Sequence, residues 1–408
     1  LKGGVQMLCQ FSFHNFRSYK SETTFDFQAA TLPEFKETLI TQDKASDLLP
    51  VAVVYGPNGG GKSNLLEALA CLISTVARPV HELGKNRQQY IFQQKTEAVP
   101  FLYDHESASS PIEFRIYFRI QNNEYCYYIS LKDEEVISES LYRKTIGAKR
   151  SATIFEREGS TIELGYTLSK ERGINTAVNP KMPYVSFLAI NYDIPEINEV
   201  LYWFESCIVQ NYAHPMVEHR IMLRNDEKFK QSVLKALHDM DIDIVDYRYD
   251  EETKQLFTQR QIGEQKVELP FQEESEGTRK IIAALPILLM ALAQGRLVII
   301  DELDAKLHPK LLRYVIFLFK DKKINQHGAQ LLFTSHDMYT LKNTVFRRDE
   351  IWFAAENAKH ESEIYSLYEI RNEDNERVKN TAAYDKQYME GRYGADPYLS
   401  NMLGGEFE

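Results

Sequence analysis

The sequence predicts an α/β fold built on a mixed, largely parallel β-sheet. Three short apolar runs predict its buried strands: Val51–Tyr55, Leu297–Ile300 and Gln330–Phe333. Runs of this kind, rich in valine, isoleucine and leucine, are typical of strands covered on both faces. The first run leads into a glycine-rich turn, the second into two carboxylates and the third into Thr-Ser-His.

The remaining elements follow from periodicity. Residues 7–27 alternate as short strands, and 100–165 is strand-like throughout. Residues 194–241 are predicted to be largely helical, including Lys228–Met240. A buried helix at 281–293 and a turn precede the strand at 297–300, and two further strands are predicted at 350–353 and 363–368. The chain has no internal repeat and no sustained heptads, which argues against a long coiled coil.

Composition limits the class of protein. The net charge is -11 and the pI about 5.5, which disfavours continuous binding to nucleic acid because phosphate neutralisation needs a basic face. Four dispersed cysteines without a CxxC predict neither a disulfide framework nor a zinc site, and they fit a reducing cytoplasm. No signal peptide is recognised before the first motif, and Leu1–Gln6 reads as an extension before a natural start at Met7. The apolar stretch 281–300 is broken at Gln294-Gly295-Arg296, so no membrane partner is expected.

The first chemical motif is the octapeptide 56–63, which matches GxxxxGK[ST]. Its residues, with the asparagine that follows, are Gly56, Pro57, Asn58, Gly59, Gly60, Gly61, Lys62, Ser63 and Asn64. Glycines let backbone N–H groups approach phosphate oxygens, and the helix that follows directs its positive end at them. Lys62 would reach the β- and γ-phosphates of a nucleotide, and Ser63 would bind Mg²⁺. The alternative is a chance glycine-rich turn, but a buried strand before it and an amphipathic helix after it favour the phosphate loop.

The second motif is the acidic pair Asp301-Glu302 at the end of an apolar strand. Adjacent buried carboxylates are costly unless a cation offsets their charge. Asp301 would hold Mg²⁺, directly or through water, and Glu302 would act as general base on the attacking water. The alternative is a helix cap or a solvated turn.

Three further signals separate one class of phosphate-loop protein from the rest. Ser275 and Gly277 stand at the start of an apolar helix, where they form either an anion cradle or an ordinary helix cap. Residues 303–309 follow the acidic pair, where a loop along a dimer interface is expected. His336 ends the third strand, where it would hydrogen-bond the γ-phosphate and position water, unless it is merely structural.

In this order the motifs resemble the cassette-type (ABC-type) ATPases related to chromosome-structuring (SMC) and recombination-repair proteins. Within them the chain is most similar to the small ATPases of bacterial abortive-infection and anti-phage systems, the AAA15 group, with the overcoming-lysogenisation (OLD) nucleases as cousins. The resemblance covers about half of the chain, at its two ends. It is carried by Asn15-Phe16-Arg17-Ser18, the phosphate loop, Ser275-x-Gly277-Thr278, Asp301-Glu302-Leu303-Asp304, Leu307-His308-Pro309, Ser335-His336 and Gly391-Arg392-Tyr393-Gly394-Ala395.

The resemblance implies an ATPase head that uses ATP and Mg²⁺ and pairs with a second copy, as a homodimer or a higher oligomer. Ser275 and Gly277 would contact the γ-phosphate of ATP held by the other subunit, and Arg17 would help bind the nucleotide. A glutamine that senses Mg²⁺ is also implied, for which Gln93 or Gln94 is the candidate. The expected parts are an N-terminal lobe at 7–77, an inserted β-rich and then helical region at 78–269, and a C-terminal lobe at 270–408.

Two functions stay open. The first is an ATP-hydrolysing sensor and scaffold in anti-phage defence that controls a separate nuclease or toxin, because only 72 residues follow His336, too few for the nuclease domain of the cousins. The second is a DNA-clamping repair ATPase. Nucleic acid is therefore kept as an open partner. The basic residues that could supply a patch for it are Lys144, Lys149, Arg150 and Arg157, and the alternative is that they belong to a solvated hairpin. The signature Ser-Glu-Gly-Thr differs from that of transporters, so transport is not favoured.

Overall fold

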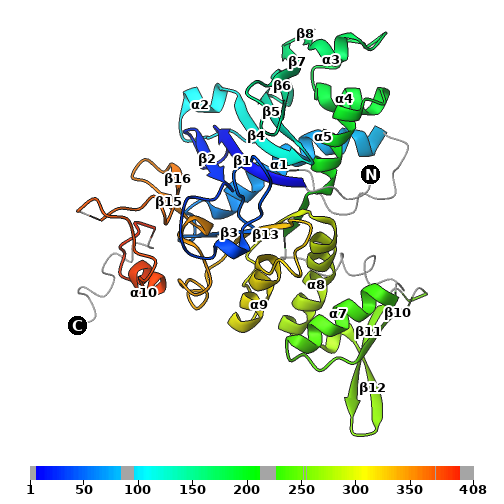
Figure 1. Ribbon diagram of the computed structural model, residues 1–408, viewed down its shortest axis with the longest axis vertical. Helices are drawn as coiled ribbons and strands as arrows, with labels where there is room; N and C mark the ends of the chain where they lie inside the picture. The colour runs from blue at the N-terminus through cyan, green and yellow to red at the C-terminus, as the bar shows by residue number, and fades with distance from the viewer. Residues whose placement is uncertain are drawn as a thin grey trace.

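A computed structural model of the chain describes residues 6–83, 96–211, 227–250, 252–253, 255–372 and 374–395. Within them the strands form three sheets (Figure 1). The parallel strands expected from the sequence lie in a six-stranded sheet. Its order is β16 (Ser362–Ser366), β15 (Ile351–Glu356), β3 (Val51–Tyr55), β14 (Gln330–Thr334), β13 (Leu297–Asp301) and β9 (Ile208–Asn211). All neighbours pair in parallel except β15 and β16, so the predicted α/β class with a mixed sheet is confirmed.

A seven-stranded antiparallel sheet lies beside it. Its order is β2 (Thr23–Asp26), β1 (Gln6–His14), β4 (Ile112–Ile120), β5 (Asn123–Lys132), β6 (Glu135–Thr145), β7 (Ala152–Glu158) and β8 (Thr161–Leu164). Strand β1 pairs with β4 from Gln6 opposite Ile120 to His14 opposite Glu113. One sheet therefore crosses the boundary expected at residues 77 and 78.

Three strands form a small sheet of their own, which projects beyond α7 in Figure 1. They are β10 (Asp246–Asp250), β11 (Gln255–Ile262) and β12 (Gln265–Pro270). Strand β12 leads through the 3₁₀ turn η2 (Phe271–Glu273) into α8 (Glu276–Gln294). This sheet is thus joined directly to the helix that carries the predicted signature.

The helices fall on two sides of the parallel sheet. Strand β3 shows why: Ala52 and Val54 pack into one apolar core, and Val51, Val53 and Tyr55 pack into the other. The first core contains α1 (Lys62–Leu83), α4 (Tyr184–Asn191), α5 (Pro195–Ser206) and the inner face of the antiparallel sheet. The second contains α7 (Glu227–Asp239), α8 and α9 (Pro309–Lys320). The shorter elements are α2 (His105–Ser109), α3 (Tyr166–Ser169), α10 (Tyr384–Met389), η1 (Lys36–Thr38) and η3 (Arg348–Glu350).

Most predicted elements are confirmed, including the helix at 281–293, the strands at 297–300, 350–353 and 363–368, and the helix at 228–240. The stretch 194–241 was predicted to be largely helical, but it also contains β9 beside β13. Arg157 was a candidate for a basic patch or, alternatively, for a solvated hairpin, and both interpretations are wrong for this residue. Its side chain is buried and donates to the carbonyls of Gly159 and Met182 at 3.0 and 2.8 Å.

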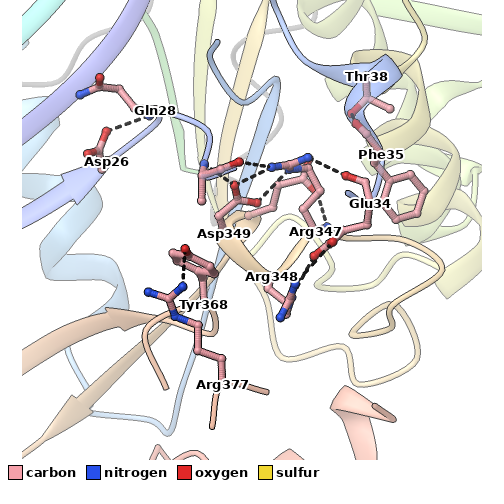
Figure 2. Close-up of polar contacts among 12 residues, drawn as sticks. Asp26, Gln28, Glu34, Phe35, Thr38, Arg347, Arg348, Asp349, Tyr368 and Arg377 are labelled. Carbon is pink, nitrogen blue, oxygen red and sulfur yellow. Dashed lines mark hydrogen bonds and ion pairs between the residues drawn. The ribbon is translucent and has the colours of Figure 1, made fainter. Parts of the chain in front are cut away.

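A buried polar cluster fixes the loop after β2 to the start of β15 (Figure 2). Arg347, with no exposed surface, donates to both carboxylate oxygens of Asp349 and to the carbonyls of Ala30 and Glu34. Arg348 donates to the Glu34 carboxylate at 2.9 Å. Because buried charges are retained only when they are paired and hydrogen-bonded, this cluster sets the position of η3 and of β15, which follows it.

Candidate active site

The phosphate loop lies between β3 and α1, and the β15–β16 hairpin packs closely against it. A Cβ atom on Gly56 would stand 2.1 Å from the carbonyl oxygen of Ala354, and one on Gly60 would stand 2.6 Å from the same oxygen. Gly61 has φ +99°, and its Cβ would meet the Ser362 hydroxyl at 2.4 Å. A Cβ atom on Gly59, at φ +82°, would have nothing within 4 Å among the residues that the structure describes. Glycine is therefore required on the packed side of the loop by lack of space, while the loop at Gly59 is open.

Lys62 is buried at the first turn of α1, and its ammonium lies inside the loop. Nζ donates to the carbonyls of Gly56 and Pro57, each at 2.9 Å. Burial lowers the pKa of Lys62, and the carboxylates at positions 301, 302 and 304 act in the opposite direction. The charge of this lysine is thus held between the loop carbonyls and an acidic edge of the sheet.

Residues from both ends of the chain form hydrogen bonds around the phosphate loop and the first turn of α1. Asn64 donates to the Ser18 hydroxyl at 2.7 Å, and Ser362 donates to the same oxygen at 2.7 Å. The Tyr19 hydroxyl donates to the carbonyl of Gly61 at 3.1 Å. Ser63 is exposed beside them. Ser18 belongs to a stretch that the sequence singled out, whereas Ser362 had no motif to reveal it.

Arg17 lies beside α1. Its guanidinium forms an ion pair with Glu67 at 2.8 Å, and its backbone N–H donates to the carbonyl of Val99. The residue has φ +50°, a left-handed conformation that a side chain makes costly. Burial raises the pKa of Glu67, and Arg17 opposes this shift. The predicted contact between Arg17 and nucleotide remains a prediction.

The acidic pair ends β13, next to β14. The Thr334 hydroxyl donates to Oδ1 of Asp301 at 2.6 Å and accepts from the backbone N–H of Glu302 at 2.7 Å. One hydroxyl therefore fixes both acidic residues, and sequence reasoning missed it because a threonine inside an apolar strand carries no distinct signal.

Glu302 adopts φ +52° and its side chain is exposed. The turn that it begins is held from α8, where the buried Lys280 donates to the carbonyls of Glu302 and Ala305 at 2.8 and 2.6 Å. Burial lowers the pKa of Lys280 to about 8, against the opposing effect of nearby carboxylates. A strained backbone conformation persists only where surrounding contacts hold it, and Lys280 holds Glu302 in this conformation.

His336 follows β14, and its backbone N–H donates to Oδ2 of Asp304 at 3.0 Å. Burial lowers the pKa of His336, and so does Lys62, while the three carboxylates at 301, 302 and 304 raise it. The imidazole is therefore neutral near pH 7, and it can both donate and accept a hydrogen bond. The predicted residues Lys62, Asp301, Glu302 and His336 therefore lie within electrostatic range of one another.

The predicted signature residues, Ser275 and Gly277, lie at the start of α8. Ser275 caps α8 by accepting from the backbone N–H of Thr278 at 3.2 Å, and its side chain is exposed. Gly277 stands against the loop after β13, where a Cβ would be 2.9 Å from the carbonyl oxygen of Lys306. In the part of the chain that the structure describes, no hydrogen bond or ion pair joins Ser275 or Gly277 to the phosphate loop.

The residues present fit a nucleoside triphosphate with Mg²⁺. The loop is packed behind Gly56, Gly60 and Gly61 and open at Gly59, as a cradle for phosphate oxygens requires. Among the described residues, Oδ1 of Asp304 is buried and has no hydrogen-bond partner, as a group that binds a ligand would be. Ser63 and Asp301 are oxygen donors of the kind that Mg²⁺ prefers.

Gln93 and Gln94, the candidate Mg²⁺-sensing glutamines, lie outside the described residues. Among the helices that the structure describes, none has the length and apolar character that a membrane span needs.

A family model described as "AAA domain, putative AbiEii toxin, Type IV TA system" matches residues 51–342. None of the curated proteins matches the chain.

Solved structures of SMC heads are among the similar ones. The SMC head domain from Thermotoga maritima has 11% identity, covering 88% of this chain and 98% of that chain, with a TM-score of 0.39. The SMC head bound to the C-winged helix domain of ScpA has 13% identity, covering 88% and 97%, with a TM-score of 0.41. An SMC head with an extended coiled coil, bound to the C-terminal domain of ScpA derived from Pyrococcus furiosus, has 12% identity, covering 89% and 96%, with a TM-score of 0.41.

Proposed function

Because the chain belongs to the AAA-domain family whose description names AbiEii toxins and type IV toxin–antitoxin systems, we propose that it hydrolyses ATP in sites that two copies complete. The observation that carries the proposal is the separation of the two phosphate-binding elements. Ser275 caps an exposed helix start, whereas Lys62 lies in a loop to which no described hydrogen bond or ion pair connects that serine. A helix N-terminus attracts anions, so the exposed cap is suited to phosphate presented by a second copy.

Within one head the roles follow from position. Lys62 and the loop N–H groups bind the β- and γ-phosphates, and Ser63 and Asp301 hold Mg²⁺, which offsets negative charge on the phosphates. Glu302 takes the proton from the attacking water, and its backbone is fixed by Thr334 and Lys280. His336, neutral at physiological pH, orients that water or donates to the γ-phosphate.

Assembly follows from the same arrangement. ATP on one head would be contacted by Ser275 and Gly277 of the other, so binding joins the heads and hydrolysis separates them. Such a cycle suits a sensor and scaffold in anti-phage defence, with nucleotide state controlling the release of a separate effector, a nuclease or toxin. The description of the family supports this setting, since it names a toxin–antitoxin system.

The second candidate, a DNA-clamping repair ATPase, is less favoured. It requires a basic groove on paired heads, and one of the four residues expected to supply it, Arg157, is buried among backbone carbonyls. The net charge of -11 also works against wrapping a duplex.

The test is Ser275→Arg, with Ser232→Arg, at an exposed serine of α7, as matched control. Ser275→Arg should leave ATP binding by the isolated chain within about twofold, since no described hydrogen bond joins Ser275 to the phosphate loop, and should lower hydrolysis by about 100-fold. Light scattering should then detect no ATP-dependent dimer. A Ser275→Arg protein that hydrolyses ATP at the normal rate would rule out the composite site.

The same test has a complementation arm. The Lys62→Ala protein has a defective phosphate loop and an intact signature at Ser275. The Ser275→Arg protein has an intact phosphate loop and a defective signature. A mixture of the two proteins can form one intact site per dimer, so hydrolysis should reappear on mixing. Recovery on mixing would also exclude general misfolding as the cause of either loss.

A further inference from the structure

The outer face of the antiparallel sheet is hollowed across β4, β5 and β6. A hollow of about 470 Å³ is lined by Arg115, Tyr117, Glu124, Tyr125, Cys126, Tyr128, Ser140, Tyr142, Arg143, Lys144 and Ser151. A second hollow of about 220 Å³ shares Glu124 and Lys144 with it and reaches Lys44 and Arg119. The two hollows therefore form one depression across three neighbouring strands.

This face is opposite the core. Side chains alternate along a strand, and the inward residues of β4, such as Phe118, stack on Trp203 of α5 at 4.4 Å between ring centroids. The next residues along, Arg115 and Tyr117, consequently point to the other side.

Strand pairing places the aromatic and basic residues of β4, β5 and β6 opposite one another. Arg115 is opposite Tyr128, and its guanidinium lies 5.3 Å from the centroid of that ring. Tyr117 is opposite Cys126, which is opposite Tyr142. Three half-buried tyrosines thus line the hollow side by side. Tyrosine rings presented in this way can stack on planar ligands, and stacking tolerates any base because each base has a π-face.

The depression is lined by more cations than carboxylates. Its five cations are Arg115, Arg119, Arg143, Lys144 and Lys44. Three of them are paired: Arg119 with Glu124 at 3.1 Å, Arg143 with Glu196 at 2.7 Å and Lys44 with Asp43 at 3.9 Å. Across the described residues, neither Arg115 nor Lys144 has a carboxylate within ion-pair distance, although the chain carries a net charge of -11.

We propose that this tyrosine face (Arg115, Tyr117, Tyr128, Tyr142 and Lys144) binds single-stranded nucleic acid, with bases stacked on the tyrosines and phosphates held by the two cations. The track runs from Arg115 toward Lys144 and Lys44, because a third hollow on the other side of Arg115 carries Glu22 and Glu113. Half-buried rings are accessible to an unpaired base but not to a base within a duplex, so single strands are the ligand.

The proposal is independent of ATP hydrolysis, because the tyrosine face shares no residue with the phosphate loop, the acidic pair or the signature. It would give the scaffold a ligand to sense. Binding should therefore survive in the Lys62→Ala protein, so failure of the ATPase proposal and failure of this one can be told apart.

The experiment uses the full chain and fluorescein-labelled oligo(dT) and oligo(rU) of about 12 nucleotides, a length within the range covered by known single-strand sites. Anisotropy is titrated between about 50 and 200 mM NaCl, with a duplex of equal length in parallel. Tyr128→Ala and Tyr142→Ala should each weaken single-strand binding by about 5- to 100-fold, and Tyr128→Phe should change it by less than about twofold. Arg115→Gln and Lys144→Gln should each reduce the salt slope by about 0.7.

The matched control is a second tyrosine and lysine on the surface. Lys170 lies 3.9 Å from the centroid of Tyr166, which is 75% exposed and outside both hollows. Tyr166→Ala and Lys170→Gln should leave binding unchanged. The proposal is overturned if no single strand binds, if the duplex binds as well as the single strand, or if the control pair matters as much as the tyrosine face. Thermal melting of each variant identifies misfolding, and if the alanine variants misfold, Arg115→Gln and Lys144→Gln still decide the outcome through the salt slope, because they leave the tyrosines in place.

Discussion

Arg260 donates through Nη2 to Oε2 of Glu274 at 2.7 Å, and Glu274 directly precedes Ser275. The other carboxylate oxygen accepts from the Thr258 hydroxyl at 2.7 Å, and Glu274 is only 7% exposed. Both donors stand on β11, so the projecting sheet fixes the residue before the predicted signature. The position of Ser275 therefore depends on a buried ion pair that comes from outside the two main sheets.

Arg260→Met should remove this fixation. The carboxylate of Glu274 would stay buried with one strong partner lost, which costs about 1–3 kcal/mol of stability. We expect hydrolysis to fall about tenfold, with ATP binding by the isolated chain unchanged. Urea unfolding and steady-state hydrolysis measure the two effects, and Arg260→Lys should recover part of the activity.

The control for Arg260→Met is Arg248→Met, which breaks an exposed ion pair with Glu268 on the same small sheet. Exposed pairs contribute little, so this variant should behave as the unmodified chain does. Equal loss in both variants would mean that the sheet is generally unstable rather than that Glu274 positions the signature.

Glu302→Gln should separate binding from hydrolysis. Glutamine keeps the size of the side chain, and the backbone remains held by Thr334 and Lys280, but the amide cannot accept the proton from water. We expect ATP affinity within about twofold of normal and hydrolysis lowered by at least about 100-fold. Size-exclusion chromatography with light scattering should show a persistent dimer with ATP and Mg²⁺. A monomer under these conditions would argue against nucleotide-linked assembly.

The sequence predicted the strands that carry chemistry because their signals are local. Val51–Tyr55 is apolar throughout and is followed by glycines, and Leu297–Ile300 is followed by two acids, so the strand and the turn were both encoded within a few residues. The same holds for the helix Glu276–Gln294, whose apolar stripe begins at a serine cap.

What the sequence did not predict depends on contacts between distant residues. Strand β1 pairs with β4 about a hundred residues later, and no local pattern encodes that neighbour. Thr334 and Lys280 act through hydrogen bonds to backbone atoms of another segment. Arg157 was predicted to lie on the surface because basic residues usually do, whereas it is buried with Glu139 and backbone carbonyls around it. Burial of a charged side chain is a tertiary property.

The rate of ATP hydrolysis should fall at acidic pH because His336 becomes protonated, which gives the pH–rate profile an acid limb. Its pKa is lowered by burial and by Lys62, so the ring loses its neutral form only when the pH falls below its ordinary value of 6.5. The unfolded chain binds that proton first, so stability associated with His336 is present above pH 6.5 and is lost as the pH falls through the lower folded-state value. The rate of hydrolysis against pH should show this limb in the unmodified chain and lack it in His336→Gln. An identical profile in the two proteins would exclude titration of His336 as its origin.

Gly61→Ala should disrupt the phosphate loop by crowding. A Cβ there would meet the Ser362 hydroxyl at 2.4 Å, at φ +99°. We expect loss of ATP binding and a stability decrease of roughly 2 kcal/mol. Gly59→Ala is the matched control, because its φ is also positive but no atom of the described part of the chain lies within 4 Å of the added atom. Isothermal titration with ATP should therefore separate the two variants, and equal losses would place the effect in backbone strain alone.

Lys280→Met should release the turn that begins at Glu302. The two carbonyls that Lys280 holds would lose their donor, and Glu302 would no longer be kept at φ +52°. We expect kcat to fall about tenfold with KM for ATP little changed, since the phosphate loop is not involved.

The pH dependence of the free energy of unfolding provides a second test of Lys280. The folded-state pKa of about 8 lies below the ordinary 10.5, so the native state is favoured most above pH 10.5, and that advantage is lost as the pH falls through 8. Urea unfolding at several pH values between these limits should show the unmodified chain gaining up to about 3 kcal/mol relative to Lys280→Met as the pH rises. A constant difference between the two proteins would mean that Lys280 stays charged in the folded chain, and the turn would then be held by a full ammonium rather than by a group close to deprotonation.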